Sequence, residues 1–231
     1  LKTRIDETEL IIHLIRAGTP DSVKFNIFAR INTGGRALTL QELRHALIPG
    51  QARELLAKLA DGESFLDATL RSVKKDRMAD REMVLRFLAF RLTPPSDYPR
   101  GDLDIFLRQA MRQINTLDRG AIARLTEDFE RAMRTARDIF EEHAFRKRFA
   151  GQEKRLPVNK ALFETISVNL AKMAPGEIEV LRERRDLVQS RLMELMEDGK
   201  FHQAISVATG DAEKVRRRFG AVEELLREVA R

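Results

Sequence analysis

From residue 39 onward the chain is a succession of segments with helical periodicity, each closed by Gly, Pro or a run of charged residues. Such breaks carry the turn chemistry that ends helices. No fixed repeat period links the segments, so we do not expect a solenoid. The pattern predicts a mainly α protein, a helical bundle of about ten helices. These helices are expected at residues 39–48, 51–60, 63–71, 80–92, 102–117, 120–143, 159–173, 177–197, 200–207 and 212–230.

Two of the predicted helices are apolar over a wide arc. The helix at 80–92 carries Phe87 and Phe90 among other apolar residues, and the longer helix at 120–143 carries Phe129 in an apolar stripe. A helix that is apolar on most sides is typical of the centre of a bundle. Aromatic residues at this spacing are far more often core than ligand platform. We therefore expect both helices to build the core.

The N-terminal segment has a different pattern. A compact and partly β-branched apolar run at residues 10–15 predicts a strand at about 9–16. A lone strand is unstable without neighbours, and we expect its partners upstream of Leu1. His13 lies inside this run. A histidine in such a position is more often a core or edge residue than a metal ligand or a catalytic base.

A helix is announced next by Thr19 as N-cap and Pro20 at the first helical position. Its apolar residues fall on two sides, which predicts a helix sandwiched between two layers. The Asn-Thr-Gly-Gly sequence at 32–35 supplies the termination, because Asn and Gly tolerate the left-handed conformation that closes helices. The two apolar sides are made by Val23, Ile27 and Ile31, and by Phe25 and Phe28.

The residues at the start of the next helix, near residue 39, match helix-capping patterns and need no functional explanation. Thr39 and Glu42 fit a capping box, and Leu38 with Leu43 fits the hydrophobic staple around it. These four residues therefore carry no functional information.

The junction between the two helices holds the best candidates for a ligand site. Arg30, Asn32, Gly34, Gly35 and Arg36 gather there. Exposed backbone N–H groups, a glycine turn and two guanidinium groups are suited to binding phosphate. The alternative is a well-capped corner without a ligand, since helix-Gly-Gly-helix corners are common.

The charge balance favours an anionic partner only mildly. The net charge of +6 comes from 42 basic and 36 acidic residues, and most of these must lie on solvated helix faces. Thirty-one of the 42 are Arg and 11 are Lys by count. Because Arg binds phosphate in a bidentate manner, this bias favours a nucleotide or a nucleic acid.

Basic clusters occur at 74–77, 146–148, 182–185 and 216–218, and each is by itself most simply a solvated face. The loop from Arg146 to Arg155 is the most suggestive, because Phe145 and Phe149 interleave with its cations; the alternative is that both rings anchor the loop. The candidate DNA contacts in this loop are Arg146, Lys147 and Arg148.

Several classes of function find no motif here. The chain has no cysteine, which excludes disulfides and thiolate zinc sites. Its four histidines are scattered, and neither a paired-carboxylate motif, a G-K-[ST] loop nor a G-x-S-x-G elbow is present. No apolar run is long enough to span a membrane, and the charged N-terminal stretch is not a secretory signal. We therefore expect a cytoplasmic protein without a membrane partner.

Residues 25–47, FNIFARINTGGRALTLQELRHAL, resemble the signature of the domain-of-unknown-function 262 family, the N-terminal domain of GmrSD-type, modification-dependent restriction endonucleases. The likeness continues at 80–91, DREMVLRFLAFR, and at 159–164, NKALFE. The family's second signature, a D-G-x-x-R loop that handles nucleotide phosphates, does not occur in this chain. We expect it upstream of Leu1.

The resemblance implies a fold related to the ParB and sulfiredoxin proteins. Residues 1–48 would be the C-terminal part of that α/β core, and residues 49–231 a helical domain. Asn32 would help to hold a metal, Mg²⁺ with a nucleoside triphosphate, and Arg30 would contact phosphate. Gly34 and Gly35 would permit close approach of the backbone to the nucleotide.

Two functions follow as hypotheses. In the first, implied by the resemblance, the chain is a nucleotide-binding domain, with NTP hydrolysis as its candidate activity, of a bacterial DNA-restriction or anti-phage defence protein. A separate nuclease domain or subunit would act with it, and the chain by itself would be inactive. In the second, motivated by the basic clusters, it is a non-catalytic helical module that binds DNA or another protein.

Overall fold

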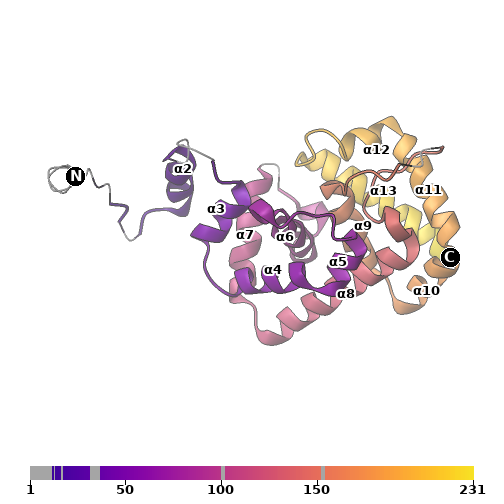
Figure 1. Ribbon diagram of the computed structural model, residues 1–231, viewed down its shortest axis with the longest axis horizontal. Coiled ribbons are helices and arrows are strands. Elements are labelled where there is room, and N and C mark those ends of the chain that lie inside the picture. The colour runs from indigo at the N-terminus through magenta and orange to yellow at the C-terminus, as the bar shows by residue number, and fades with distance from the viewer. Residues whose placement is uncertain (1–11, 13, 17, 32–36, 100–101, 152–153) are drawn as a thin grey trace, which may run out of the picture. The chain divides into compact units, whose positions relative to one another are not determined.

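The computed structural model describes residues 12, 14–16, 18–31, 37–99, 102–151 and 154–231 (Figure 1). The chain divides into two compact units, residues 1–39 and residues 40–231. The first unit contains helix α2, Asp21–Ile31, and all other described helices belong to the second.

Helix α2 begins one residue later than the capping pattern predicts. The carbonyl of Pro20 accepts hydrogen bonds from the backbone N–H groups of Val23 and Lys24, so Pro20 precedes the helix and does not open it. The hydroxyl of Thr19 donates to the carbonyl of Arg16 at 2.9 Å. The helix therefore follows a short turn that Thr19 stabilises.

Only part of the expected burial of α2 is found. Phe25 is buried, whereas Val23, Phe28 and Ile31 are exposed, Ile31 by 71%. The prediction that both apolar sides are covered is wrong for these three side chains. Sequence periodicity identifies an apolar side but does not say what covers it.

The predicted strand at 9–16 is not observed in the positions that the structure describes. Ile12 and residues 14–16 have no regular secondary structure, and Ile12 and Leu14 are strongly exposed. The other positions of the predicted strand lie outside the described residues, and so does the predicted turn after α2, at 32–36. A strand forms only when a neighbour pairs with its backbone, and no described segment pairs with this one. The remnant of an α/β core is therefore not seen.

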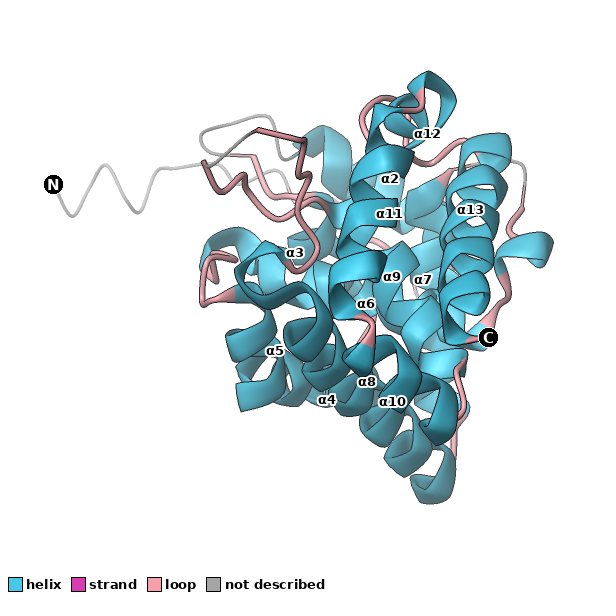
Figure 2. Ribbon diagram, turned by 90° about the vertical axis from the view of Figure 1, so that its right-hand side faces the viewer, coloured by secondary structure: helices cyan, strands magenta, loops and turns pink. Residues whose placement is uncertain are grey.

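The second unit is helical, as predicted, and Figure 2 shows its described segments as helices and loops. Its helices are α3 (Leu40–Leu47), α4 (Gln51–Asp61), α5 (Glu63–Thr69), α6 (Ala79–Leu92), α7 (Leu103–Thr116), α8 (Arg119–Phe140), α9 (Lys160–Lys172), α10 (Pro175–Glu183), α11 (Arg185–Glu197), α12 (Gly199–Ala204) and α13 (Ala212–Ala230). Short 3₁₀ helices lie at Asp76–Met78, Pro95–Asp97 and Glu141–His143. No described helix has the length and apolar character needed to cross a membrane.

One predicted helix is two helices in the structure. The segment predicted at 177–197 breaks at Arg184, between α10 and α11. Arg184 has φ −98° and ψ 24°, and its guanidinium donates to the carbonyl of Val229 at 2.8 Å, near the end of α13. Neither Gly nor Pro marks this break, and the charged run at 182–185 that coincides with it is not among the predicted helix ends. A tertiary contact accompanies the bend.

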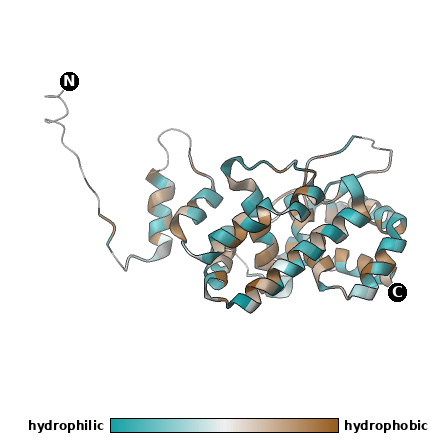
Figure 3. Ribbon diagram, turned by 60° about the horizontal axis from the view of Figure 1, so that its bottom comes forward, coloured by the Kyte–Doolittle hydropathy of each residue, from teal (hydrophilic) through white to brown (hydrophobic). Residues whose placement is uncertain are grey.

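Helix α6 lies at the centre of the core, as its apolar pattern predicts. Phe87 and Phe90 are fully buried. The ring of Phe87 lies 5.0 Å from that of Phe129 on α8, and the ring of Phe90 lies 4.7 Å from that of Phe219 on α13. Many helices carry both hydrophobic and hydrophilic stretches, which is the amphipathic pattern of a bundle (Figure 3).

A buried ionic network links three helices of the second unit. Glu164 on α9 has no exposed surface and pairs with Arg86 on α6, at 3.1 Å, and with Arg218 on α13. Arg86 also pairs with Glu82 one turn earlier, at 2.9 Å. Buried charges are tolerated when they are paired and hydrogen-bonded. The network therefore fixes the contacts of α6, α9 and α13.

Helix α3 belongs to the second unit, because the compact unit begins at Leu40, before the predicted boundary at 48/49. Arg44 on α3 is buried and pairs with Asp104 on α7. Glu42 on the same helix pairs with Arg77 at 3.0 Å. These ion pairs tie α3 to the helices that follow it.

Candidate nucleic-acid interface

The predicted phosphate site at the helix junction is described only at its edge. Arg30 is exposed in the last turn of α2. Asn32, Gly34 and Gly35 lie outside the described residues, so the grouping of these four residues stays a prediction. The same holds for Asn32 as a ligand of Mg²⁺.

The second candidate, the loop between the 3₁₀ helix at Glu141–His143 and α9, is closed at its base. Arg146 and Val158 form an isolated antiparallel bridge, and the N–H of Asn159 donates to the carbonyl of Phe145 at 2.9 Å. The side chain of Asn159 then caps α9. The two arms of the loop are therefore held together where it leaves the helical core.

The aromatic residues of this loop serve as anchors. Phe145 is fully buried, and its ring lies 4.8 Å from that of Phe163 on α9 in an edge-to-face arrangement. Phe149 is partly buried, with its ring 5.8 Å from that of His202 on α12. The interleaving of rings and cations thus reflects anchoring of the loop, which was the alternative interpretation.

Arg146 is an internal clamp. Its side chain is buried, with 3% of the residue exposed. The guanidinium donates to the carbonyls of Leu156 and Thr69, at 2.8 and 2.9 Å, and to the hydroxyl of Ser72 at 2.7 Å. It also donates to the carbonyl of Glu142 at 3.1 Å. The guanidinium of Arg146 therefore holds the loop to the end of α5. The sequence instead predicts an outward-facing contact of Arg146 with DNA.

Lys147 and Arg148 are directed to other elements. The ammonium group of Lys147 donates to the hydroxyl of Ser206 at 2.6 Å, after α12. The guanidinium of Arg148 donates to the side-chain oxygen of Gln189 on α11, also at 2.6 Å. The three predicted contacts therefore do not form a single cationic surface, since neighbouring residues point in different directions.

The cations that share one surface lie further along the loop. A groove of about 560 Å³ opens between the segment after α5, the start of α6 and the returning arm of the loop. Its walls include Lys154 and Arg155, both exposed, and Lys160 at the start of α9. None of the lining residues that the structure describes is acidic. Its other lining residues are Ser72, Val73, Ala79, Met83, Arg146, Leu156, Pro157 and Val158.

Lys154 and Arg155 have no ion-pair partner within the part of the chain that the structure describes, while Lys160 pairs with Glu82 at 3.0 Å. Arg146 likewise has no carboxylate partner there, although carbonyls and a hydroxyl satisfy its donors. Burial lowers the pKa of Arg146, and the nearby charge of Arg155 lowers it further. A positive potential therefore builds up in the groove, and an anion entering it would offset this charge.

The pKa of His143, beside the loop, is lowered in part by the same arginine charges. Burial lowers its pKa, and Arg148, Arg146 and Arg155 add to this effect against the opposing charge of Glu142. The histidine therefore favours its neutral form next to these arginines. Among the described residues, no group of three or more His, Asp or Glu side chains is arranged to hold a metal ion.

Sequence reasoning named this loop but chose Arg146, Lys147 and Arg148, which do not form one cationic surface; DNA binding by the loop stays a prediction. Lys154 and Arg155, which line the groove, lie in residues 154–157, a segment that is neither helix nor strand. Two adjacent cations close to Pro157 were the signal that could have singled them out. Lys160 was noticed only within the family resemblance.

No protein-family model, curated protein or solved structure matches the chain.

Proposed function

We propose that the helical unit, residues 40–231, is a non-catalytic DNA-binding module that holds the sugar-phosphate backbone in the cationic groove. The observation that carries the proposal is the set of cations around a groove whose described lining residues include no acid. Two of these cations, Lys154 and Arg155, are exposed and have no ion-pair partner in the described part of the chain. Phosphate contacts of this kind supply affinity without reading sequence.

The size and chemistry of the groove fit a strand of nucleic acid better than a free inorganic anion. Its volume of about 560 Å³ lies within the range of roughly 300–1,000 Å³ typical of sites for organic ligands. Its lining includes apolar residues, Val73 and Met83 among them, as well as the cations. Sugars would contact the apolar residues while phosphates meet the cations.

The resemblance of residues 25–47 to the GmrSD-type family supplies a biological setting for this proposal. A backbone-binding module would hold DNA for a bacterial restriction or anti-phage defence protein, with cleavage performed by a separate nuclease domain or subunit. The absence of catalytic motifs from the sequence is compatible with such a division of labour.

Binding of a fluorescein-labelled DNA duplex, followed by fluorescence anisotropy without any nucleotide, tests the proposal. The double variant Lys154→Ala/Arg155→Ala removes the two unpaired cations. Each lost phosphate contact weakens binding by about 8-fold at 0.1 M salt, so the double variant is expected to bind about 60-fold more weakly.

The matched control is Lys200→Ala/Arg216→Ala, which removes the same charge from two exposed positions outside the groove. This control is expected to bind DNA nearly as well as the wild type. Equal weakening by both double variants would show that net charge, and not the groove, governs binding. Failure of the wild type to bind DNA would reject the proposal.

A second candidate function is nucleotide binding at the junction after α2, motivated by the sequence RINTGG at 30–35. Mg²⁺ with a nucleoside triphosphate would bind there through Arg30, Asn32, Gly34 and Gly35. Calorimetric titration of the protein with nucleotides and magnesium tests this candidate. Binding that is unchanged in Arg30→Ala and Asn32→Ala variants would reject the site.

A further inference from the structure

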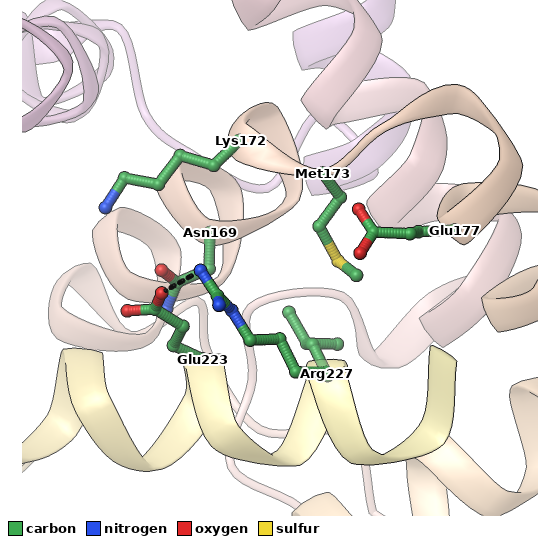
Figure 4. A pocket seen from close by; sticks show the side chains of 7 residues that line it. Asn169, Lys172, Met173, Glu177, Glu223 and Arg227 are labelled. Atoms are coloured by element: carbon green, nitrogen blue, oxygen red, sulfur yellow. Dashed lines mark ion pairs between the residues drawn. The ribbon is translucent and has the colours of Figure 1, made fainter. Parts of the chain in front are cut away.

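A second cavity lies in the helical unit, where α9 ends, α10 begins and α13 passes (Figure 4). Its volume is about 150 Å³, and it shares no lining residue with the cationic groove. The lining consists of Asn169, Lys172, Met173, Glu177, Glu223, Leu226 and Arg227. It therefore combines an amide, two cations, two anions and two apolar side chains.

Asn169 provides the first indication of a ligand. The residue is 97% buried, and its amide nitrogen donates to the carbonyl of Phe219 at 3.0 Å. Its side-chain oxygen is also buried, but no described residue donates a hydrogen bond to it. Because buried polar atoms in folded proteins nearly always have a partner, this oxygen calls for a donor from outside the chain. The donor must be an N–H or O–H group.

The charges around the cavity provide the second indication. Lys172 has no hydrogen bond or ion pair with any described residue, while Arg227 pairs with Glu223 at 2.7 Å (Figure 4). Partial burial lowers the pKa of Lys172; Glu223 opposes this effect, and Arg91 and Arg227 reinforce it. A carboxylate placed here would pair with Lys172 and offset this repulsion.

The remaining lining residues limit what can bind. Glu177 is already engaged, because its carboxylate accepts the backbone N–H of Ala174 at 2.7 Å. The two apolar lining residues, Met173 and Leu226, are both largely buried. A volume of about 150 Å³ is well below the roughly 300–1,000 Å³ of sites for larger organic ligands, which excludes a nucleotide or a nucleic-acid strand.

We infer that this cavity binds a free aliphatic α-amino acid. The ammonium group donates to the side-chain oxygen of Asn169 and meets the carboxylate of Glu223. The ligand's carboxylate meets Lys172 and Arg227. Its aliphatic side chain packs against the apolar part of the lining. All three parts of an amino acid thus find a complementary group, and no covalent step is involved.

The test is calorimetric titration of the full chain with leucine and with valine, up to about 10 mM. Two analogues of leucine keep its size and remove one group each: isocaproic acid has no ammonium group, and isoamylamine has no carboxylate. The wild type is expected to bind at least one of the two amino acids, and to bind the two analogues at least tenfold more weakly. No heat of binding with either amino acid, or equal binding of the analogues, would overturn the inference and leave water as the occupant.

A pair of lysine variants localises the site. Lys172→Met keeps the length and apolar stem of the side chain and removes its charge, and it is expected to weaken binding of the amino acid at least tenfold. Lys200→Met makes the same change at an exposed position outside the cavity and is expected to have no effect. Equal affinities of the two variants would place any binding elsewhere. DNA binding by the groove is independent of both outcomes.

Discussion

Replacement of Glu164 by Gln is expected to destabilise the helical unit severely. Glu164 is fully buried, and its two carboxylate oxygens face Arg86, at 3.1 Å, and Arg218. The substitution keeps the shape of the side chain but removes its charge. One of the two guanidinium groups then faces an amide NH₂ group, and both lose their shared counterion.

The size of the effect follows from what remains around each arginine. Arg86 keeps its pair with Glu82 at 2.9 Å. Among the described residues, Arg218 keeps the carbonyls of Thr209, at 2.8 Å, and Ala204, at 3.4 Å, and the ring of Phe219 at 5.7 Å, but no carboxylate. Removing one member of a buried ion pair costs about 3–5 kcal/mol because it leaves an uncompensated charge in the interior. That is a large part of the roughly 5–15 kcal/mol by which a domain is stable.

Urea unfolding followed by far-UV circular dichroism measures this loss, since the chain has no tryptophan for fluorescence. The control is Glu63→Gln, which breaks an ion pair with Arg71 whose side chains are 73% and 61% exposed. An exposed pair contributes about 0–1 kcal/mol. If both variants lose stability to within about 1 kcal/mol of each other, the buried network does not hold the bundle as described.

Two further predictions concern the ionisation of Tyr98 at alkaline pH and the turn at Gly50. Burial, reinforced by the charge of Glu164, raises the pKa of Tyr98, the chain's only tyrosine, to about 12. The neutral phenol is therefore expected to stabilise the folded state below pH 10, and this contribution is lost as the pH rises through 12. An absorbance titration of Tyr98 with a midpoint near 10.0 would contradict this prediction. Gly50 has φ +124°, and a Cβ there would lie 2.6 Å from the side-chain oxygen of Asn115, so Gly50→Ala is expected to cost about 1–3 kcal/mol and lower the melting temperature by roughly 2–12 °C. Gly199→Ala, with open space at its Cβ, is expected to leave that temperature nearly unchanged, and equal shifts would refute the steric argument.

Local sequence predicted most of the helices of the second unit because their ends carry Gly, Pro or capping residues. The turn at Pro49-Gly50 separates α3 from α4, and Asp118 and Asp211 each cap the helix that follows them. The break at Arg184 was missed because it has no such residue and coincides with a contact to α13. Turn chemistry is local, whereas that contact is tertiary.

Hydrophobic periodicity could not predict which charged residues are buried. Arg44, Arg86 and Arg218 read as ordinary members of amphipathic helices, yet each is buried with an acidic partner. Partners 54 to 78 residues apart in sequence, as in the pairs made by Glu164, cannot be recognised without the fold.

The candidate interface likewise depends on contacts between residues that are distant in sequence. The loop that begins at Arg146 was recognised from its cations and rings. Which cations face the groove depends on the clamp that Arg146 makes with the end of α5, and this clamp leaves Lys154 and Arg155 on the groove wall. The candidate residues at 32–35 lie outside the described part of the chain and stay a prediction.

The salt dependence of DNA binding tests the proposed groove most directly. With three phosphate contacts, from Lys154, Arg155 and Lys160, the logarithm of the wild-type association constant should fall with the logarithm of salt with a slope of about −2.7, or about 40-fold between 50 and 200 mM. The Lys154→Ala/Arg155→Ala variant should give a slope of about −0.9, and the Lys200→Ala/Arg216→Ala control should match the wild type. A slope that is the same in the groove variant and in the wild type would contradict the assignment of the groove as the site where DNA binds.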